Sequence, residues 1–238
     1  MLSIILPAYN ESRSIQKNLA TLEAYLKNHL NTDYEILVIN DGSTDDTAVQ
    51  AEHYSSPFVQ VLSYSPNRGK GYAIQYGMKQ AQGDYLLFMD VDLATDLNEI
   101  EKFYILISEN IYDLIIGNRK TKEAIQHIKQ PFYRRFLGKG FTFLCQILLG
   151  SRITDFTCGF KMYTREAARI IFTRQSIYDW SFDAELIYIA HKHHLKIKEL
   201  PVVWTDDPNS KVNVLISIIK SLWGIFKIRF NDIQNKYQ

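Results

Sequence analysis

The first half of the chain repeats one pattern, in which a short apolar segment of strand type is followed by a segment with helical spacing. The strand-type segments are residues 2–9, 34–41, 59–65, 84–92 and 112–119. The helical segments between them are residues 11–30, 42–54, 71–83 and 96–110. Apolar strands without strict alternation are typical of a parallel sheet buried on both faces. The pattern therefore predicts an α/β fold with a mostly parallel, Rossmann-like sheet flanked by helices.

The pattern changes after Arg119. The next 31 residues, 120–150, are helical in pattern, basic and rich in aromatic residues. The segments expected after them are a loop leading into a strand at 154–164, a helix at 180–194, a strand at 196–204 and an amphipathic helix at 210–230. No repeat or low-complexity linker separates these segments. We therefore expect a catalytic domain over residues 1–210 and a C-terminal amphipathic helix with a tail over residues 211–238.

Composition excludes several classes of protein. The formal net charge of +1 creates no overall field that would attract nucleic acid. Two cysteines without metal-ligand spacing are too few for a disulfide framework, which suggests a reducing cytoplasm. The N-terminal segment lacks the basic region of a signal peptide. No apolar stretch reaches the roughly 20 residues that span a bilayer, so we expect any membrane contact to be peripheral.

Polar clusters follow three of the expected strands, at residues 7–11, 40–47 and 90–92. In an open parallel sheet, ligands bind beyond the carboxyl ends of the strands. Asp90 and Asp92 are two residues apart, so on an extended chain they face the same way. Mg²⁺ prefers oxygen ligands and usually takes one or two carboxylates together with substrate phosphates. The pair suits a metal–diphosphate site, although such a motif alone has many chance matches. Asp96 is expected to cap the next helix.

Taken together, these segments resemble the family 2 glycosyltransferases, whose catalytic domain has the GT-A fold. The matching stretches in the first half are SIILPAYNE, EILVINDGSTDDT, NRGKGYAIQYGMKQAQGDYLLFMDVD and IIGNR. The second half resembles the polyprenyl-phosphate sugar transferases through RRFLGKGFTFLCQILLG, ITDFTCGFKMYTREAA, WSFDAELIYIAHKHHLKIKELPVVW and NSKV. Within these, SFDAELIYIA is most similar to the dolichyl-phosphate glucosyltransferases. The resemblance covers approximately residues 2–220.

The resemblance implies a role for particular residues around the nucleotide. The residues expected to line the base and ribose are Pro7, Ala8, Tyr9 and Glu11. Asp41 is expected to hydrogen-bond the base or ribose, and Lys70 to lie near the nucleotide. Asp90 and Asp92 are expected to hold Mg²⁺ or Mn²⁺, with Asp92 the stronger ligand.

The resemblance also implies cationic residues around the phosphates. Arg119 and Arg135, or its neighbour Arg134, are expected to face the phosphates of the donor or the lipid. Ser210 and Lys211 are expected to close over the diphosphate.

The reaction that the resemblance implies is inverting, metal-dependent transfer of a hexose, glucose from UDP-glucose in the first instance, to a dolichyl or undecaprenyl phosphate. The second pKa of a phosphate monoester is about 6, so such an acceptor is largely a dianion at neutral pH and needs positioning more than a general base. Asp155 is either the base used on a hydroxyl acceptor or an orienting residue. Two alternatives stay open: a transferase acting on a glycan hydroxyl, and a non-catalytic nucleotide-sugar-binding subunit of a membrane complex. A homo-oligomer is also open.

The final expected helix has two interpretations. Apolar residues at helical spacing, among them Phe226 and Phe230, are explained by packing against the core. Trp223 and Ile225 add apolar surface beyond that stripe, and basic residues accompany them, as in helices that lie in a membrane interface. We hypothesise that this helix and residues 131–150 dock the protein on the cytoplasmic face of an anionic membrane.

Overall fold

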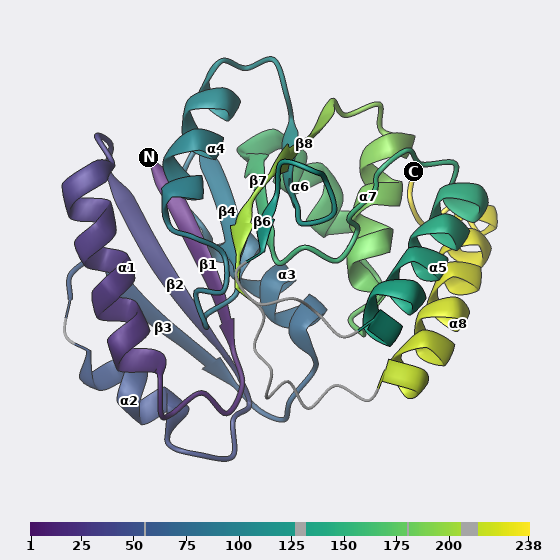
Figure 1. Cartoon of the computed structure of the whole chain (residues 1–238). Coiled ribbons are helices and arrows are strands. Elements are labelled where there is room, and N and C mark those ends of the chain that lie inside the picture. Colours follow the sequence, from purple (N-terminus) through teal and green to yellow (C-terminus); the bar gives the residue numbers. More distant parts are fainter. Residues whose placement is uncertain (55, 127–131, 180, 206–213) are drawn as a thin grey trace.

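The computed structural model describes residues 1–54, 56–126, 132–179, 181–205 and 214–238, and the side chains of 126, 132–139, 141 and 214–222 are not among those described. Its centre is a seven-stranded sheet (Figure 1). The strands are, in chain order, β1 (Leu2–Ala8), β2 (Tyr34–Asp41), β3 (Val59–Tyr64), β4 (Tyr85–Met89), β5 (Leu114–Asn118), β7 (Phe160–Thr164) and β8 (Ile197–Pro201). Their order across the sheet is β3-β2-β1-β4-β7-β5-β8, and all neighbours are parallel except β7, which runs antiparallel to β4 and β5. The predicted mostly parallel α/β sheet is confirmed.

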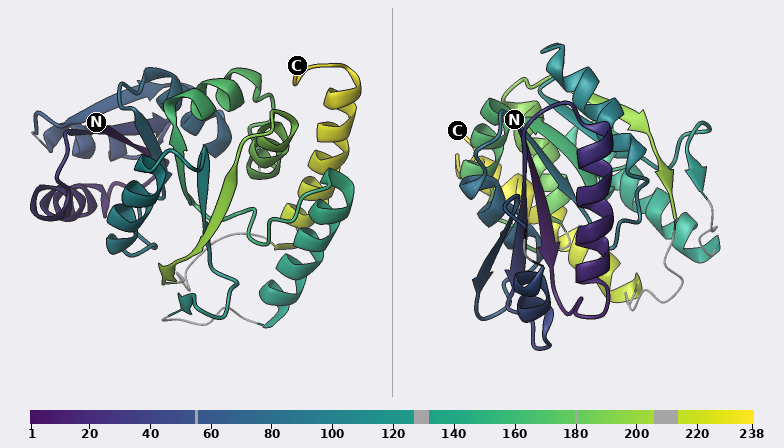
Figure 2. Two further views of the ribbon diagram at one scale, coloured as in Figure 1. Left: turned by 90° about the horizontal axis from the view of Figure 1, so that it is seen from above. Right: turned by 90° about the vertical axis from the view of Figure 1, so that its left-hand side faces the viewer.

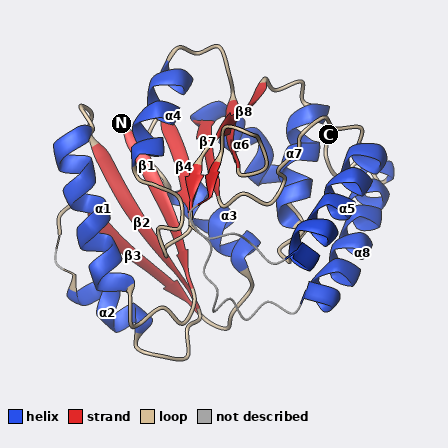
Figure 3. Ribbon diagram, in the orientation of Figure 1, coloured by secondary structure: helices blue, strands red, loops and turns tan. Residues whose placement is uncertain are grey.

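Helices cover both faces of this sheet (Figures 2 and 3). One face carries α1 (Ile15–His29), α2 (Thr47–His53) and α4 (Asn98–Ser108). The other carries α3 (Lys70–Gln80), α6 (Arg165–Arg174) and α7 (Phe182–Lys192). Two further helices, α5 (Phe132–Leu149) and α8 (Val214–Ile233), pack side by side at the end of the molecule beyond α7. A small parallel pair, β6 (Ile125–Gln126) and β9 (Val203–Trp204), lies outside the main sheet.

Strand β1 shows why the strands lack polar alternation. Ile4 and Leu6 are buried under α1 and α4, whereas Ile5 is buried under α3 on the opposite face. Neighbouring side chains on a strand point to opposite faces, and here both faces are covered. On α1, which lies in the segment predicted to be helical, the apolar residues at helical spacing are fully buried: Ile15, Leu19, Leu22 and Leu26.

The second half contains the features that the sequence pattern did not reveal. Strand β7 was expected after residue 154, but its insertion between β4 and β5 and its antiparallel direction were not. Helix α6 was also not anticipated, although it begins with a clear cap in which Thr164 Oγ1 accepts a hydrogen bond from the Ala167 N–H at 3.2 Å. The helix expected from residue 120 begins at Phe132, because β6 comes first.

The C-terminal segment belongs to the main hydrophobic core. Ile225 and Ile228 of α8 are fully buried, and so is Tyr237 in the tail. The Tyr237 hydroxyl donates to Glu185 Oε1 at 2.6 Å and accepts from Asn231 Nδ2 at 3.2 Å. These hydrogen bonds join the C-terminal end of α8 and the tail after it to α7. Among the described helices, none is both long enough and apolar enough to cross a bilayer.

Tyr237 provides a test of this fastening. Tyr237→Ala should lower the free energy of unfolding by about 3–5 kcal/mol, the range for removal of a buried aromatic side chain. Tyr237→Phe should cost about 1–3 kcal/mol, because the buried Glu185 carboxylate loses a donor. Urea unfolding measures both values, and exposed Ile111 supplies a control in Ile111→Ala. Equal stability of all four proteins would contradict the packing of the tail.

Candidate functional site

The loop after β1 places its polar residues beside the loop after β2. Pro7 and Ala8 end β1, with Ala8 buried, and Tyr9 is 46% exposed at the strand end. The Glu11 N–H donates to Thr47 Oγ1 at 2.7 Å, and the Glu11 carboxylate accepts from Ser14 Oγ at 3.0 Å. These bonds hold the loop that follows β1 against the start of α2. The residues predicted to line the nucleotide thus lie at the carboxyl end of β1, beside the carboxyl end of β2. Their contact with a nucleotide stays a prediction.

Asp41 shapes the turn that precedes α3. Its buried carboxylate accepts hydrogen bonds from the Arg68 N–H at 2.7 Å, the Gly69 N–H at 3.0 Å, Asn67 Nδ2 at 2.9 Å and the Tyr64 hydroxyl at 2.8 Å. Gly69 has a φ of 93°, a left-handed conformation that glycine adopts readily. Asp41 therefore determines the backbone path that brings α3 to the site, whether or not it also contacts a base or ribose as predicted.

Lys70, the first residue of α3, forms an ion pair with Asp90 Oδ1. Burial alone would lower the pKa of Lys70, but the charges of Asp90 and Asp183 outweigh it and raise the pKa. The lysine is therefore a permanent cation at the end of β4. The prediction that Lys70 lies near the nucleotide stays a prediction.

The three carboxylates after β4 have different surroundings. Asp90 is paired with Lys70, whereas Asp92 is exposed and its Oδ1 accepts the Ala94 N–H at 3.0 Å. Asp96 Oδ1 accepts the Asn98 N–H at 2.8 Å at the start of α4. Asp96 thus caps the helix as expected, from one residue before the formal N-cap position. Asp90 and Asp92 are therefore the two carboxylates at the end of β4 that remain candidates for metal binding.

Arg119 and Asp155 form a bidentate ion pair. Arg119 Nε donates to Asp155 Oδ2 at 2.8 Å and Nη2 donates to Oδ1 at 2.9 Å, while the Arg119 N–H also donates to Oδ2 at 3.0 Å. Asp155 is fully buried, and burial alone would raise its pKa. The charge and hydrogen bonds of Arg119 outweigh burial and hold the Asp155 pKa well below its usual value. A carboxylate of this kind is a poor proton acceptor, which favours the orienting role over the role of general base.

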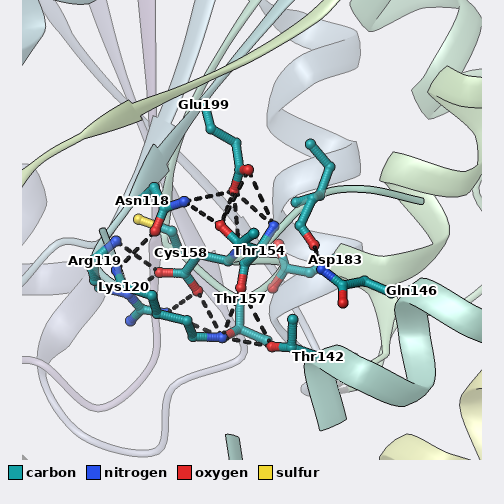
Figure 4. Close-up of polar contacts among 12 residues, drawn as sticks. Asn118, Arg119, Lys120, Thr142, Gln146, Thr154, Thr157, Cys158, Asp183 and Glu199 are labelled. Carbon is teal, nitrogen blue, oxygen red and sulfur yellow. Dashed lines mark hydrogen bonds and ion pairs between the residues drawn. The ribbon is translucent and has the colours of Figure 1, made fainter. Parts of the chain in front are cut away.

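A second layer of polar contacts supports this pair (Figure 4). The Glu199 carboxylate accepts from Asn118 Nδ2 at 2.9 Å and from the N–H groups of Thr154 and Asp155, each at 3.0 Å. Glu199 comes from β8 and Asn118 ends β5, so the loop with Asp155 is fixed to two strands. This layer therefore holds the backbone of Asp155 in place beside Arg119.

Lys120 connects the site to helix α5. Its ammonium donates to Thr142 Oγ1 of α5 at 2.7 Å and to the Thr154 carbonyl oxygen at 3.1 Å (Figure 4). Lys120 Nζ also lies 3.6 Å from Asp155 Oδ1. Burial lowers the pKa of Lys120, since its partial enclosure outweighs the attraction of Asp155.

Two buried charged residues were missed by sequence reasoning. Lys161 of β7 is fully buried, and its ammonium contacts Asp183 at the start of α7 and donates to the Cys158 carbonyl oxygen at 2.8 Å. Asp183 lies in SFDAELIYIA, and Lys161 lies in TDFTCGFKMYT. A lysine inside an apolar strand and an aspartate opening an apolar helix were the available signals. Neither shows from sequence alone that the two side chains meet.

The structure does not describe the side chains of three residues that were predicted to bind phosphate. Arg135 lies in α5, but its side chain is not among those described, and Ser210 and Lys211 lie outside the described residues. Their predicted roles stay predictions.

The donor set at β4 limits how a metal ion is held. Among the residues that the structure describes, no three His, Cys, Asp or Glu side chains gather as a metal cluster. His191 contacts Ser151 Oγ at 2.9 Å and His193 contacts the Tyr237 carbonyl oxygen at 2.8 Å, so these histidines have structural partners. Asp90 and Asp92 supply carboxylate oxygens only. They fit a hard divalent cation that takes its other ligands from water and a diphosphate.

The Arg119–Asp155 pair predicts a pH-dependent stability. Asp155→Asn should lower the free energy of unfolding by about 3–5 kcal/mol at pH 7, because it leaves Arg119, whose side chain is only 21% exposed, without its counter-charge. The folded-state pKa of Asp155 lies below the usual 3.8, so the stabilisation is complete above that value and is lost as the pH falls toward the folded-state pKa. Urea unfolding between pH 7 and pH 3 should therefore show the difference between the two proteins shrinking below about pH 4. A difference independent of pH would contradict the pairing.

Comparison with known proteins agrees with this geometry. A sequence profile described as "Glycosyl transferase family 2" matches residues 3–172. Dolichyl-phosphate beta-glucosyltransferases are similar along most of the chain: one from Trichomonas vaginalis is 36% identical over 89% of this chain and 66% of its own length, and one from Dictyostelium discoideum is 36% identical over 96% and 74%. The enzyme of that name from Saccharomyces cerevisiae is 32% identical over 100% and 76%. The chain therefore spans 66% to 76% of the length of these relatives.

Solved structures share the fold. Glucosyl-3-phosphoglycerate synthase from Mycobacterium tuberculosis, crystallised with Mn²⁺, UDP-glucose and phosphoglyceric acid, superposes with a TM-score of 0.71 at 17% identity, covering 96% of this chain and 79% of that one. The fold implied by the resemblance is thereby confirmed. Since the family profile covers well over half of the chain, this protein belongs to glycosyl transferase family 2.

Proposed function

We propose that the protein transfers glucose from UDP-glucose to a polyprenyl phosphate with inversion at the anomeric carbon. The observation that carries this proposal is the similarity to dolichyl-phosphate beta-glucosyltransferases, which extends through the second half of the chain. Similarity confined to the nucleotide-binding half would support a nucleotide-sugar donor but would say nothing about the acceptor.

The strand ends supply the groups that this donor requires. Asp90 and Asp92 would hold Mg²⁺ or Mn²⁺, and Mn²⁺ accompanies UDP-glucose in the structural neighbour. Such an ion stabilises the negative charge of the leaving diphosphate. Lys70 holds a fixed positive charge beside Asp90, and Arg119 is held rigid by Asp155. Preorganised cations of this kind stabilise developing charge without reorganisation.

The state of Asp155 favours a phosphate acceptor over a hydroxyl acceptor. A glycan hydroxyl needs a base, and Asp155 is buried, paired and held at low pKa. A phosphate monoester is largely deprotonated at neutral pH, so its own oxygen can attack once cations position it. Arg119, with a guanidinium fixed by Asp155, is the described residue best suited to that task.

The neighbouring helices α5 and α8 both expose apolar side chains, here together called the apolar face, which suit a membrane surface. Its residues are Phe143 and Ile147 on α5, and Trp223, Phe226, Phe230 and Ile233 on α8, all between 58% and 77% exposed. On α8 these residues recur at helical spacing opposite the buried Ile225 and Ile228. Lys227 and Arg229 flank the exposed stripe, as in basic interfacial helices. We include in the proposal that this face lies on the cytoplasmic surface of an anionic membrane, where the lipid acceptor resides.

The direct test is a transfer assay with labelled UDP-glucose or GDP-mannose and a short polyprenyl phosphate. We expect organic-phase product from UDP-glucose, lost when EDTA removes the metal. The absence of lipid-linked product from both donors, with protein that binds UDP, would contradict the proposed reaction.

Asp92→Ala should reduce transfer by at least about a hundredfold. Metal ions contribute several kcal/mol to charge stabilisation in such reactions, and about 1.4 kcal/mol corresponds to a factor of ten. Asp96→Asn is the matched control, because asparagine is an equally good cap and Asp96 serves the helix. Comparable losses in both variants, measured as initial rates, would show that Asp92 has no special role.

Flotation with anionic vesicles tests the membrane face. Phe226→Glu combined with Phe230→Glu should abolish vesicle binding, since both side chains are exposed and the change opposes apolar and electrostatic attraction alike. Ile105 is 55% exposed and belongs to α4, a helix that lies away from α5 and α8 (Figure 1), so Ile105→Glu should leave binding intact. Unchanged flotation of the double variant would exclude this face.

A further inference from the structure

Gly159, the residue immediately before β7, lies directly against the Asp90 carboxylate. A Cβ atom at this position would be 2.1 Å from Asp90 Oδ2, 2.6 Å from Cγ and 2.9 Å from Oδ1. These distances are far below normal van der Waals contact distances, and all three atoms belong to the Asp90 side chain. The backbone of Gly159 is not in the left-handed region that favours glycine. The obstacle to a larger residue here is therefore the carboxylate.

The strand register explains this contact. In the antiparallel ladder between β4 and β7, Met89 is the partner of Phe160. Continuing the register by one residue places Asp90 opposite Gly159. Directly opposed residues hold their Cβ atoms about 4.5–5.5 Å apart, so the Asp90 side chain lies next to the Gly159 backbone. With glycine on one strand, the carboxylate can fold across the partner backbone.

The groups around this contact hold the strand and one edge of the carboxylate. Asp90 Oδ1 is bound to Lys70, which fixes the other edge of the carboxylate. Phe160 is fully buried, so the backbone next to Gly159 is held in the sheet. Lys161, on the same side of the strand as Gly159, contacts buried Asp183 and lies 5.1 Å from the centre of the Phe88 ring. Because the strand is held in the sheet, an added Cβ would have to be accommodated by movement of the Asp90 carboxylate, whose side chain is 37% exposed.

We propose that Gly159 is a positioning residue for Asp90. By offering a bare backbone, it lets the carboxylate lie between Lys70 and β7, at the place where the proposed metal–diphosphate site needs it. The role of Asp90 toward the donor rests on the proposed function, whereas the contact between Gly159 and Asp90 does not. An alanine at 159 displaces the carboxylate, separates it from Lys70 and weakens metal-dependent nucleotide binding.

A double-mutant cycle tests the proposal in protein without metal, donor or acceptor. Gly159→Ala should lower the midpoint of thermal unfolding in the wild-type background, because the new methyl group collides with the carboxylate. In Asp90→Ala the three colliding atoms are gone, so adding Gly159→Ala should leave the midpoint unchanged or raise it. Gly140→Ala is the matched control, since a Cβ at Gly140 meets nothing within 4 Å. Equal losses in both backgrounds would overturn the proposal.

Titration calorimetry with UDP and Mn²⁺ provides the second measurement. Gly159→Ala should weaken the Mn²⁺-dependent affinity at least tenfold, with no further loss when Asp90→Ala is already present. If Gly159→Ala fails to fold, the double variant should still fold, and failure of both overturns the proposal. The double-mutant cycle of unfolding midpoints can be interpreted even if the wild-type protein transfers no sugar. A negative transfer assay therefore counts against the proposed function and not against this contact.

Discussion

The antiparallel strand β7 determines how the site is built. By entering the sheet between β4 and β5, it brings the segment from Asp155 to Lys161 alongside the ends of two parallel strands. One strand end carries Asp90, which lies against Gly159, and the other carries Arg119, which is paired with Asp155. Because β7 runs antiparallel, its first residues and the loop before it lie at the carboxyl ends of β4 and β5. The site thus depends on one reversal of strand direction.

Around β7, three cations are each paired with a carboxylate. Arg119 faces Asp155 and Lys161 faces Asp183, while the less buried Lys70 faces Asp90. Burying an unpaired charge costs several kcal/mol, so removing one partner is more damaging than the net contribution of the pair suggests. The consequence for function is rigidity, because a paired guanidinium presents its remaining N–H groups in one fixed direction. That is the property a site needs when it stabilises a leaving diphosphate and positions a dianionic acceptor.

The sequence was informative wherever structure follows from local pattern. Helix α1 and the strands of the first half follow from periodicity, and the polar clusters after them follow from the rule that ligands bind at strand ends. The contacts Lys161–Asp183 and Asp90–Gly159 depend on strand order and register, and residue spacing along a chain contains neither. Asp155 illustrates the same limit, since its partner and its lowered pKa decide its role, and both come from a residue 36 positions away.

Helix α8 shows that an apolar stripe does not by itself indicate which side faces the core. Phe226 and Phe230 have the spacing of core residues, yet both are exposed, and Ile225 and Ile228 are buried in their place. Gly224 lies so close to Ser181 that a Cβ atom there would be 1.8 Å from its Oγ, so glycine brings this side of the helix against the start of α7. The buried side is thus selected by close backbone approach and by Tyr237, which anchors the tail to Glu185. A helix held in this way can leave large aromatic residues in solvent, and the proposed lipid acceptor favours contact with a membrane as the reason for their exposure.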